Sequence, residues 1–177
     1  MTEEHLMIQV KNGELDSLAP LFEQYHIKLY NFFLRLTRDG EVSRDLTQNV
    51  FKRVLLYRQS YNEGNKFRSW LYQIARNIHL DYYNSKKLFL SEYGEEEKLV
   101  YDGTSADEEL EADERRCSLR EALQRLEPEQ RELIELSRFQ ELKYKEIAEI
   151  TGNSVSAIKV KIHRAINKLR KHYFEHA

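Results

Sequence analysis

The stretch Lys143–Lys171 constrains this chain most, because it reads as two helices joined by a tight turn. Gly152 ends the first helix, where the backbone must turn left-handed, and Ser154 can cap the second. The first helix has an apolar face made of Ile147, Ala148 and Ile150. In the second helix, apolar residues recur at three- and four-residue steps and predict one buried stripe of Val155, Ile158, Ile162, Ala165, Ile166 and Leu169.

The second helix also has a basic outer face, because its cations fall off the apolar stripe: Lys159, Lys161, Arg164 and Lys168. A short helix, a glycine turn and a basic second helix follow the helix-turn-helix plan, in which the second helix enters the DNA major groove. The alternative is a plain helical hairpin with a solvated basic face. The joint placement of the turn glycine and its apolar neighbours Ala148, Val155 and Ile158 favours DNA binding.

The net charge of −2 conceals an uneven distribution of charge along the chain. Residues 1–90 carry +3, residues 91–114 carry −10 and residues 115–177 carry +5. Two mildly basic segments around an acidic one are typical of a protein that binds nucleic acid. We therefore predict two domains, residues 1–87 and 114–177, joined by an acidic linker at 88–113.

Composition also limits the possible classes of protein. The chain contains no run of eighteen apolar residues, which predicts no membrane insertion. Its start, MTEEHLMIQV, lacks the basic and apolar parts of a signal peptide. The single cysteine, Cys117, permits no internal disulfide. These features predict a cytoplasmic protein.

An all-α fold is predicted, because glycine and proline are sparse, with six and two residues, and the glycines fall between segments of helical periodicity. The first domain is expected to contain helices at 3–11, 16–38, 41–59 and 66–86. The second is expected to contain helices at 114–126, 128–139, 143–151 and 154–172, with the helix-turn-helix in the last two.

Two segments of the first domain carry candidate functional residues. The helix at 41–59 is amphipathic and is expected to bury Val42, Leu46, Val50, Phe51, Val54 and Leu55. The segment 61–87 interleaves aromatic residues with cations, which suits single-stranded DNA because bases stack on rings while phosphates meet charges. The alternative is that these aromatics are core. Both roles stay open for Trp70, whereas a shared helical face favours the core for Phe67, Leu71, Ile74 and Ile78.

Three motifs in a fixed order resemble a bacterial sigma factor of the extracytoplasmic-function (ECF) group. DLTQNVFKRV resembles the signature that binds core RNA polymerase, and FRSWLYQIARNIHLDYY resembles the helix that recognises the promoter −10 element. LEPEQRELIELSRFQELKYKEIAEITGNSVSAIKVKIHRAINKLRK resembles the region that binds the −35 element. The resemblance implies core RNA polymerase, promoter DNA and an anti-sigma factor as partners.

The resemblance also implies roles for individual residues. Binding of core polymerase falls to Asp45, Leu46, Gln48, Asn49 and Phe51. Recognition of the −10 element falls to Asn62, Asn65, Phe67, Arg68, Trp70, Arg76, Asn77 and Asp81, with Glu63 and Gly64 completing a loop that receives a flipped base. Recognition of the −35 element falls to Ser156, Ala157, Lys159, Val160, Lys161, Arg164 and Lys168.

This sequence departs from the family pattern in three places. Asn49 stands where the family has an acid, so one polymerase contact is expected to differ. The run YYNSKK replaces several arginines, which predicts weaker anchoring on duplex DNA beside the −10 element. Ala157 replaces a hydroxyl residue in the recognition helix, so no particular −35 sequence is predicted.

The leading hypothesis is an alternative sigma factor that binds core polymerase, directs it to promoters and helps to melt them. The second is a stand-alone helix-turn-helix regulator that binds duplex DNA without polymerase. An enzyme ranks third, because the six histidines form no metal-spaced cluster and no phosphate-cradling glycine loop occurs. We therefore expect no catalytic residue, metal, cofactor or small-molecule substrate.

Overall fold

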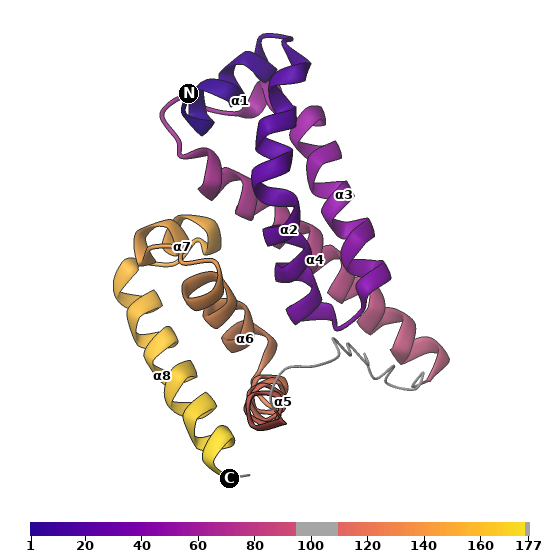
Figure 1. Cartoon of the computed structure of the whole chain (residues 1–177), viewed down its shortest axis with the longest axis vertical. Coiled ribbons are helices and arrows are strands. Elements are labelled where there is room, and N and C mark those ends of the chain that lie inside the picture. Colours follow the sequence, from indigo (N-terminus) through magenta and orange to yellow (C-terminus); the bar gives the residue numbers. More distant parts are fainter. Residues whose placement is uncertain (95–109, 176–177) are drawn as a thin grey trace. The chain divides into compact units, whose positions relative to one another are not determined.

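The computed structural model describes residues 1–94 and 110–175, and these residues form helices and connecting turns without a strand. The chain divides into two compact units, Met1–Tyr101 and Asp102–Ala177 (Figure 1). The all-α prediction is confirmed. No helix within the described residues is long and apolar enough to span a membrane.

The first unit is built around two long helices that lie side by side, α2 and α3, with α4 packed on α3 (Figure 1). Its elements are α1 (Glu3–Lys11), the 3-10 turn η1 (Leu15–Ser17), α2 (Leu18–Thr37), α3 (Gly40–Leu56), the 3-10 turn η2 (Arg58–Ser60) and α4 (Phe67–Tyr93). Asp39 caps α3, where its carboxylate accepts a 3.0 Å hydrogen bond from the Val42 N–H.

Aromatic rings hold α4 against α2 in this unit. The Tyr25 ring of α2 meets the Phe67 and Tyr72 rings of α4 edge-on, at centroid distances of 5.8 and 6.4 Å. Phe32 contacts Tyr72 in the same geometry at 5.8 Å. Edge-to-face pairs stabilise a core beyond simple burial of area, so these contacts fix where α4 begins.

The second unit contains the predicted helix-turn-helix. Its elements are α5 (Leu110–Gln124), α6 (Pro128–Ile134), the π-helical turn η3 (Glu135–Phe139), α7 (Tyr144–Thr151) and α8 (Val155–Phe174). Gly152 adopts the left-handed conformation at φ 72°, and the Ser154 hydroxyl accepts a 3.1 Å hydrogen bond from the Ala157 N–H. Leu126, Ile134 and Ala165 form a buried cluster that joins the α5–α6 turn to α8.

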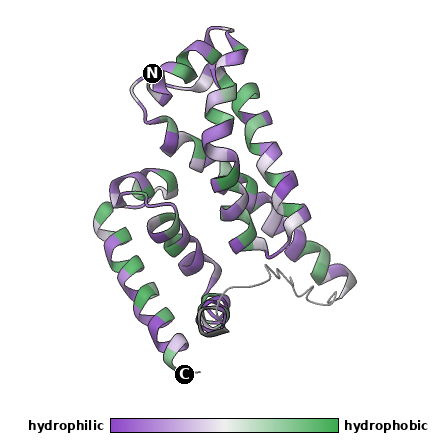
Figure 2. Ribbon diagram, in the orientation of Figure 1, coloured by the Kyte–Doolittle hydropathy of each residue, from purple (hydrophilic) through white to green (hydrophobic). Residues whose placement is uncertain are grey.

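Each helix of both units carries apolar and polar residues along its length (Figure 2). The predicted stripe of α8 is buried at Ile158, Ile162 and Ala165, and partly buried at Ile166 and Leu169. Val155 was expected in this stripe but is more than a third exposed. It is the first residue of α8, and burial begins one turn later at Ile158.

Two helix ends differ from the sequence prediction. Leu88–Tyr93 continue α4, and α5 begins at Leu110, so both ends of the segment predicted as an acidic linker are helical. Local helix propensity outweighs charge density here, because Leu, Glu and Ala are good helix formers. Gly94, which suggested a linker, instead ends α4 at φ 86°. The rest of the predicted linker, 95–109, lies outside the described residues.

Substituting the turn glycine tests the helix-turn-helix geometry. We expect Gly152→Ala to destabilise the second unit by about 1–2 kcal/mol, because the left-handed conformation crowds a Cβ against the backbone. No atom within 4 Å would clash with that Cβ, so the loss is conformational. Urea unfolding measures it. Gly152→Asn is the matched control and should lose less, since Asn tolerates this conformation; equal losses would contradict the explanation.

Candidate nucleic-acid interface

The outer edge of α3 presents polar side chains to solvent. Asp45 and Gln48 are exposed and Asn49 is half-buried, as expected for a docking surface. Leu46 and Phe51, predicted to dock with them, are only 9 % and 6 % exposed. These two residues therefore mainly anchor α3 in the core and position the polar residues beside them.

Phe22 of α2 adds an aromatic ring to this edge that sequence reasoning missed. Its centroid lies 4.8 Å from the ring of Phe51 and 4.8 Å from the parallel ring of His26. The Phe22 side chain is 41 % exposed although its neighbours Leu21 and Tyr25 are buried. The sequence pattern could have indicated this exposure, because Phe22 lies one residue off the buried stripe of α2.

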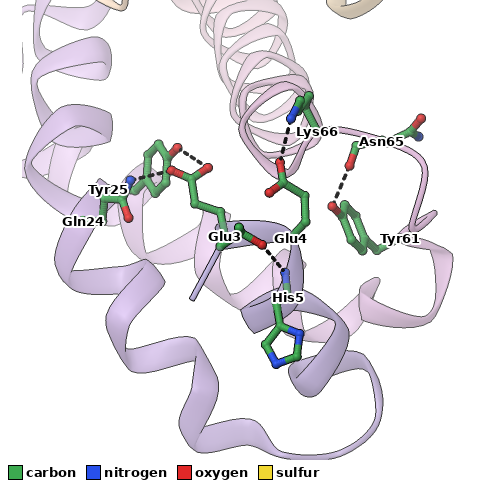
Figure 3. Close-up of polar contacts among 9 residues, drawn as sticks. Glu3, Glu4, His5, Gln24, Tyr25, Tyr61, Asn65 and Lys66 are labelled. Atoms are coloured by element: carbon green, nitrogen blue, oxygen red, sulfur yellow. Dashed lines mark hydrogen bonds and ion pairs between the residues drawn. The ribbon is translucent and has the colours of Figure 1, made fainter.

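The turn between η2 and α4 is exposed but firmly held. The Asn62 carboxamide oxygen accepts a 3.1 Å hydrogen bond from the Gly64 N–H, and the Asn62 carbonyl accepts one of 2.9 Å from the Asn65 N–H. Buried Tyr61 donates its hydroxyl to the Asn65 backbone oxygen at 2.7 Å (Figure 3). Asn62, Glu63 and Asn65 themselves remain exposed.

Two side chains of helix α1 contact this turn and help to hold it. The Lys11 ammonium donates to the Tyr61 carbonyl at 2.8 Å, and Lys66 pairs with Glu4 at 3.6 Å (Figure 3). Burial, reinforced by the charges of Glu4 and Glu3, raises the pKa of Tyr61 to about 12. The phenol is therefore a neutral donor at physiological pH, and the turn is preorganised.

The residues predicted for the −10 face of α4 do not share one face. Trp70, Asn77 and Asp81 are separated by seven and four residues, so they lie on one side of the helix. Arg68 falls on the opposite side by the same geometry, and its charge acts on Tyr25 of α2. Arg76 is half-buried and falls between the two sides.

Phe67 decides between two predictions. The family resemblance placed it in the −10 set, whereas its helical face favoured the core. Its side chain is fully buried, where its ring packs against Tyr25, Tyr61 and Trp70. A ring without exposed surface cannot stack on a base. Trp70, for which both roles were open, is half-buried and lies 5.2 Å from the Tyr61 ring, so it contributes to the core and still reaches the surface.

Asp81 makes a contact that links the two helices of this surface. Its carboxylate pairs with the Arg53 guanidinium of α3 at 3.2 Å, with the Asp81 side chain 66 % exposed. The pair joins the edge of α3 to the face of α4, and a base or phosphate that approached Asp81 would also meet the positive charge of Arg53.

The exposed side of α8 contains most of the predicted −35 residues. Ser156, Lys159, Val160 and Arg164 are exposed, and Ala157 is half-buried. Lys161 and Lys168 lie nearer the packed side, where each pairs with an acid at the start of α6. The predicted cations therefore fall into two sets. The open row is Lys159 and Arg164, and the paired row is Lys161 and Lys168.

A groove of about 410 Å³ runs between α5 and α8 in the second unit. Its walls are largely apolar and its rim is basic, with the lining residues Arg115, Arg116, Leu119, Ile166, Leu169, Arg170, Tyr173 and Phe174. Sequence reasoning missed this feature. Among the residues the structure describes, no group of three or more His, Cys, Asp or Glu side chains could hold a metal ion.

Comparison with known proteins gives the same division of the chain. Residues 21–88 match the Sigma-70 region 2 family and residues 118–169 match Sigma-70 region 4. RNA polymerase sigma factor YlaC of Bacillus subtilis is 32 % identical over 158 residues, covering 88 % of this chain and 91 % of that protein. The chain belongs to the ECF sigma factors. It is an alternative sigma factor, a protein that directs RNA polymerase to promoters.

A second relative supports this assignment, and a solved structure has a similar fold. ECF sigma factor SigW of Bacillus subtilis is 30 % identical, covering 92 % of both chains. The sigma factor RpoE, solved with the anti-sigma factor NepR from Bartonella quintana, matches with a TM-score of 0.71 at 21 % identity. That match covers 86 % of this chain and 94 % of RpoE, and it supports the fold.

Alkaline pH tests the Tyr61 contact. Its folded pKa of about 12 exceeds the ordinary 10.0, so the stability from the buried phenol is complete below pH 10 and is lost as pH rises toward 12. We expect the free energy of unfolding of the first unit to fall over this window, and to fall less in Tyr61→Phe. Tyr25, whose pKa is also raised by burial, is common to both proteins. Equal pH profiles would contradict the prediction.

Truncating Phe67 tests its assignment to the core. We expect Phe67→Ala to lower the free energy of unfolding by about 3–5 kcal/mol, because it empties a fully buried ring site. The control Tyr83→Ala removes an exposed aromatic from the same helix and should change stability by less than about 0.5 kcal/mol. Weakened DNA binding by Phe67→Ala at full stability would instead restore the direct DNA role.

Proposed function

We propose that this ECF sigma factor docks on core RNA polymerase through the outer edge of α3, opens the −10 element with the Asn62–Lys66 turn and α4, and reads the −35 element with α8. The observation that carries the proposal is the exposed but preorganised turn at the start of α4. In this proposal residues 1–87 carry docking and −10 recognition, residues 114–177 carry −35 recognition, and 88–113 connect them.

Docking needs exposed groups on a rigid support. Asp45 and Gln48 offer a carboxylate and a carboxamide in solvent, while Leu46 and Phe51 hold α3 in the core beneath them. Phe22 adds exposed apolar area next to these polar groups. Polar groups around a partly exposed aromatic are the arrangement that protein interfaces favour.

Promoter opening needs a receptor for an extruded base and no chemical step. Flipping a base out of a duplex costs a few kcal/mol, which stacking and hydrogen bonds to the base edge can offset. Carboxamides supply both a donor and an acceptor, and Asn62 and Asn65 present them in a turn that hydrogen bonds already hold. A preorganised turn loses little entropy when the base binds.

Recognition of the −35 element uses the open side of α8. Lys159 and Arg164 can bind phosphates and so fix the register of the helix. Ser156 and Ala157 are small, which lets the start of α8 approach base edges closely. We assign the readout of bases to the first turn and a half of α8, which contains Ser156 and Ala157.

Two further assignments follow from the family. An anti-sigma protein is the expected regulatory partner, and the basic-rimmed apolar groove between α5 and α8 is a surface that such a protein could cover. The site of action is the cytoplasm, where core polymerase and promoter DNA are found.

Reconstituted transcription tests the function as a whole. Purified protein added to core RNA polymerase should give transcripts with defined start sites from a genomic library of the source organism, and core polymerase alone should not. Tight, specific binding of free protein to duplex DNA, with no transcripts in the presence of core polymerase, would favour a stand-alone regulator.

Variants separate docking from promoter opening. We expect Asp45→Ala with Gln48→Ala to weaken binding to core polymerase at least tenfold, which corresponds to about 1.4 kcal/mol. The matched control Glu41→Ala alters another exposed polar residue of α3.

Asn62→Ala with Asn65→Ala should leave binding to core intact and reduce the permanganate reactivity of unpaired thymines at mapped promoters. Loss of polymerase binding in the Asn variants would contradict this separation.

A further inference from the structure

Two ion pairs join α8 to the start of α6. The Lys161 ammonium lies 2.6 Å from a carboxylate oxygen of Glu129, and that of Lys168 lies 3.9 Å from Glu127. Lys161 and Lys168 are seven residues apart and thus lie on the same side of α8. Both lysine side chains are more than a third exposed, so solvent and a ligand can reach them.

The two acids, named here the acidic corner, lie on a stretch of backbone that is held in place without help from the lysines. Glu127 is the N-cap residue of α6 and Glu129 lies in its first turn, where the helix dipole favours negative charge. The Arg131 guanidinium donates to the carbonyls of Leu123, Gln124 and Leu126 at 3.1 Å each, which closes the α5–α6 turn. The backbone that carries the acidic corner is therefore fixed by the fold.

Two other cations of α8 differ from these lysines in their contacts. The side chains of Lys159 and Arg164 are exposed and make no hydrogen bond or ion pair with any residue in the described ranges. These residues can neutralise DNA phosphates at once. A lysine held by a carboxylate must first give up that partner, and this loss offsets part of what the lysine gains from binding a phosphate.

We propose that the acidic corner competes with DNA phosphates for Lys161 and Lys168, and so limits how many phosphates α8 neutralises. This inference rests on the proposed role of α8 in DNA binding. Each phosphate contact releases counterions and steepens the fall of affinity with salt. The acidic corner therefore lowers the non-specific affinity of α8 for DNA and leaves the contacts made by the open row intact.

The salt dependence of binding tests this competition. The full chain is titrated with a random-sequence DNA duplex across a series of salt concentrations, and binding is followed by fluorescence anisotropy. We expect Glu127→Gln with Glu129→Gln to bind more tightly at low salt and to steepen the log–log salt slope by about 0.9 for each lysine released. The matched control, Glu141→Gln with Glu149→Gln, removes two exposed acids of the same unit that have no lysine partner within the described residues.

The control should bind somewhat more tightly through its changed net charge but keep the wild-type slope. Lys161→Ala with Lys168→Ala should leave the slope nearly unchanged in the wild-type protein and should abolish the gain in the Glu127→Gln, Glu129→Gln background. Circular dichroism checks that every variant is folded.

Equal salt slopes for the acidic-corner variant and its control would overturn the proposal. A failure of every protein to bind DNA would also overturn it. A shallower wild-type slope on loss of the two lysines would also overturn it, because they would then already contact phosphates. These outcomes are distinct from failure of the proposed function, which is an absence of transcripts with core polymerase.

Discussion

The packing of buried aromatic rings between α2 and the start of α4 is the constraint on which the first unit depends. Tyr25, Phe67 and Tyr72 meet edge-on and fix the first two turns of α4. Tyr61 extends this cluster and uses its hydroxyl to hold the turn that presents Asn62 and Asn65. The turn that we propose to capture a base is thus supported by a core that cannot easily shift. Ring packing and the proposed contact with DNA fall to neighbouring residues.

The second unit reaches a similar rigidity with polar contacts. Arg131 binds three carbonyls of the α5–α6 turn, a bonding pattern that the planar guanidinium with its several donors can supply. This turn packs on α8 through the cluster of Leu126, Ile134 and Ala165. The orientation of α8 relative to α6 therefore depends on the Arg131 side chain, and the same turn carries the two acids that pair with lysines of α8.

The helices and the helix-turn-helix could be predicted from the sequence, because periodicity, Gly152 and Ser154 are local signals and the structure contains each of them. The burial of Phe67 was favoured by its helical face, whereas the position of Trp70 could not be predicted, since an aromatic among cations suits either a core or a DNA surface until its neighbours are known. Pairing of Lys161 with Glu129 spans 32 residues and depends on tertiary packing. The prediction also overlooked that Arg68 and Asn77 lie on different sides of one helix, although residue spacing alone would have revealed it.

Val160 has a consequence for the kind of DNA that α8 suits. It lies on the exposed side of the helix and is 48 % exposed, and its side chain can neither donate nor accept a hydrogen bond. The apolar group that the major groove offers is the 5-methyl of thymine. Burying Val160 against that methyl removes apolar area from water on both partners. In the proposed docking of α8, a cytosine methylated at C5 would present the same apolar group to Val160 as thymine does.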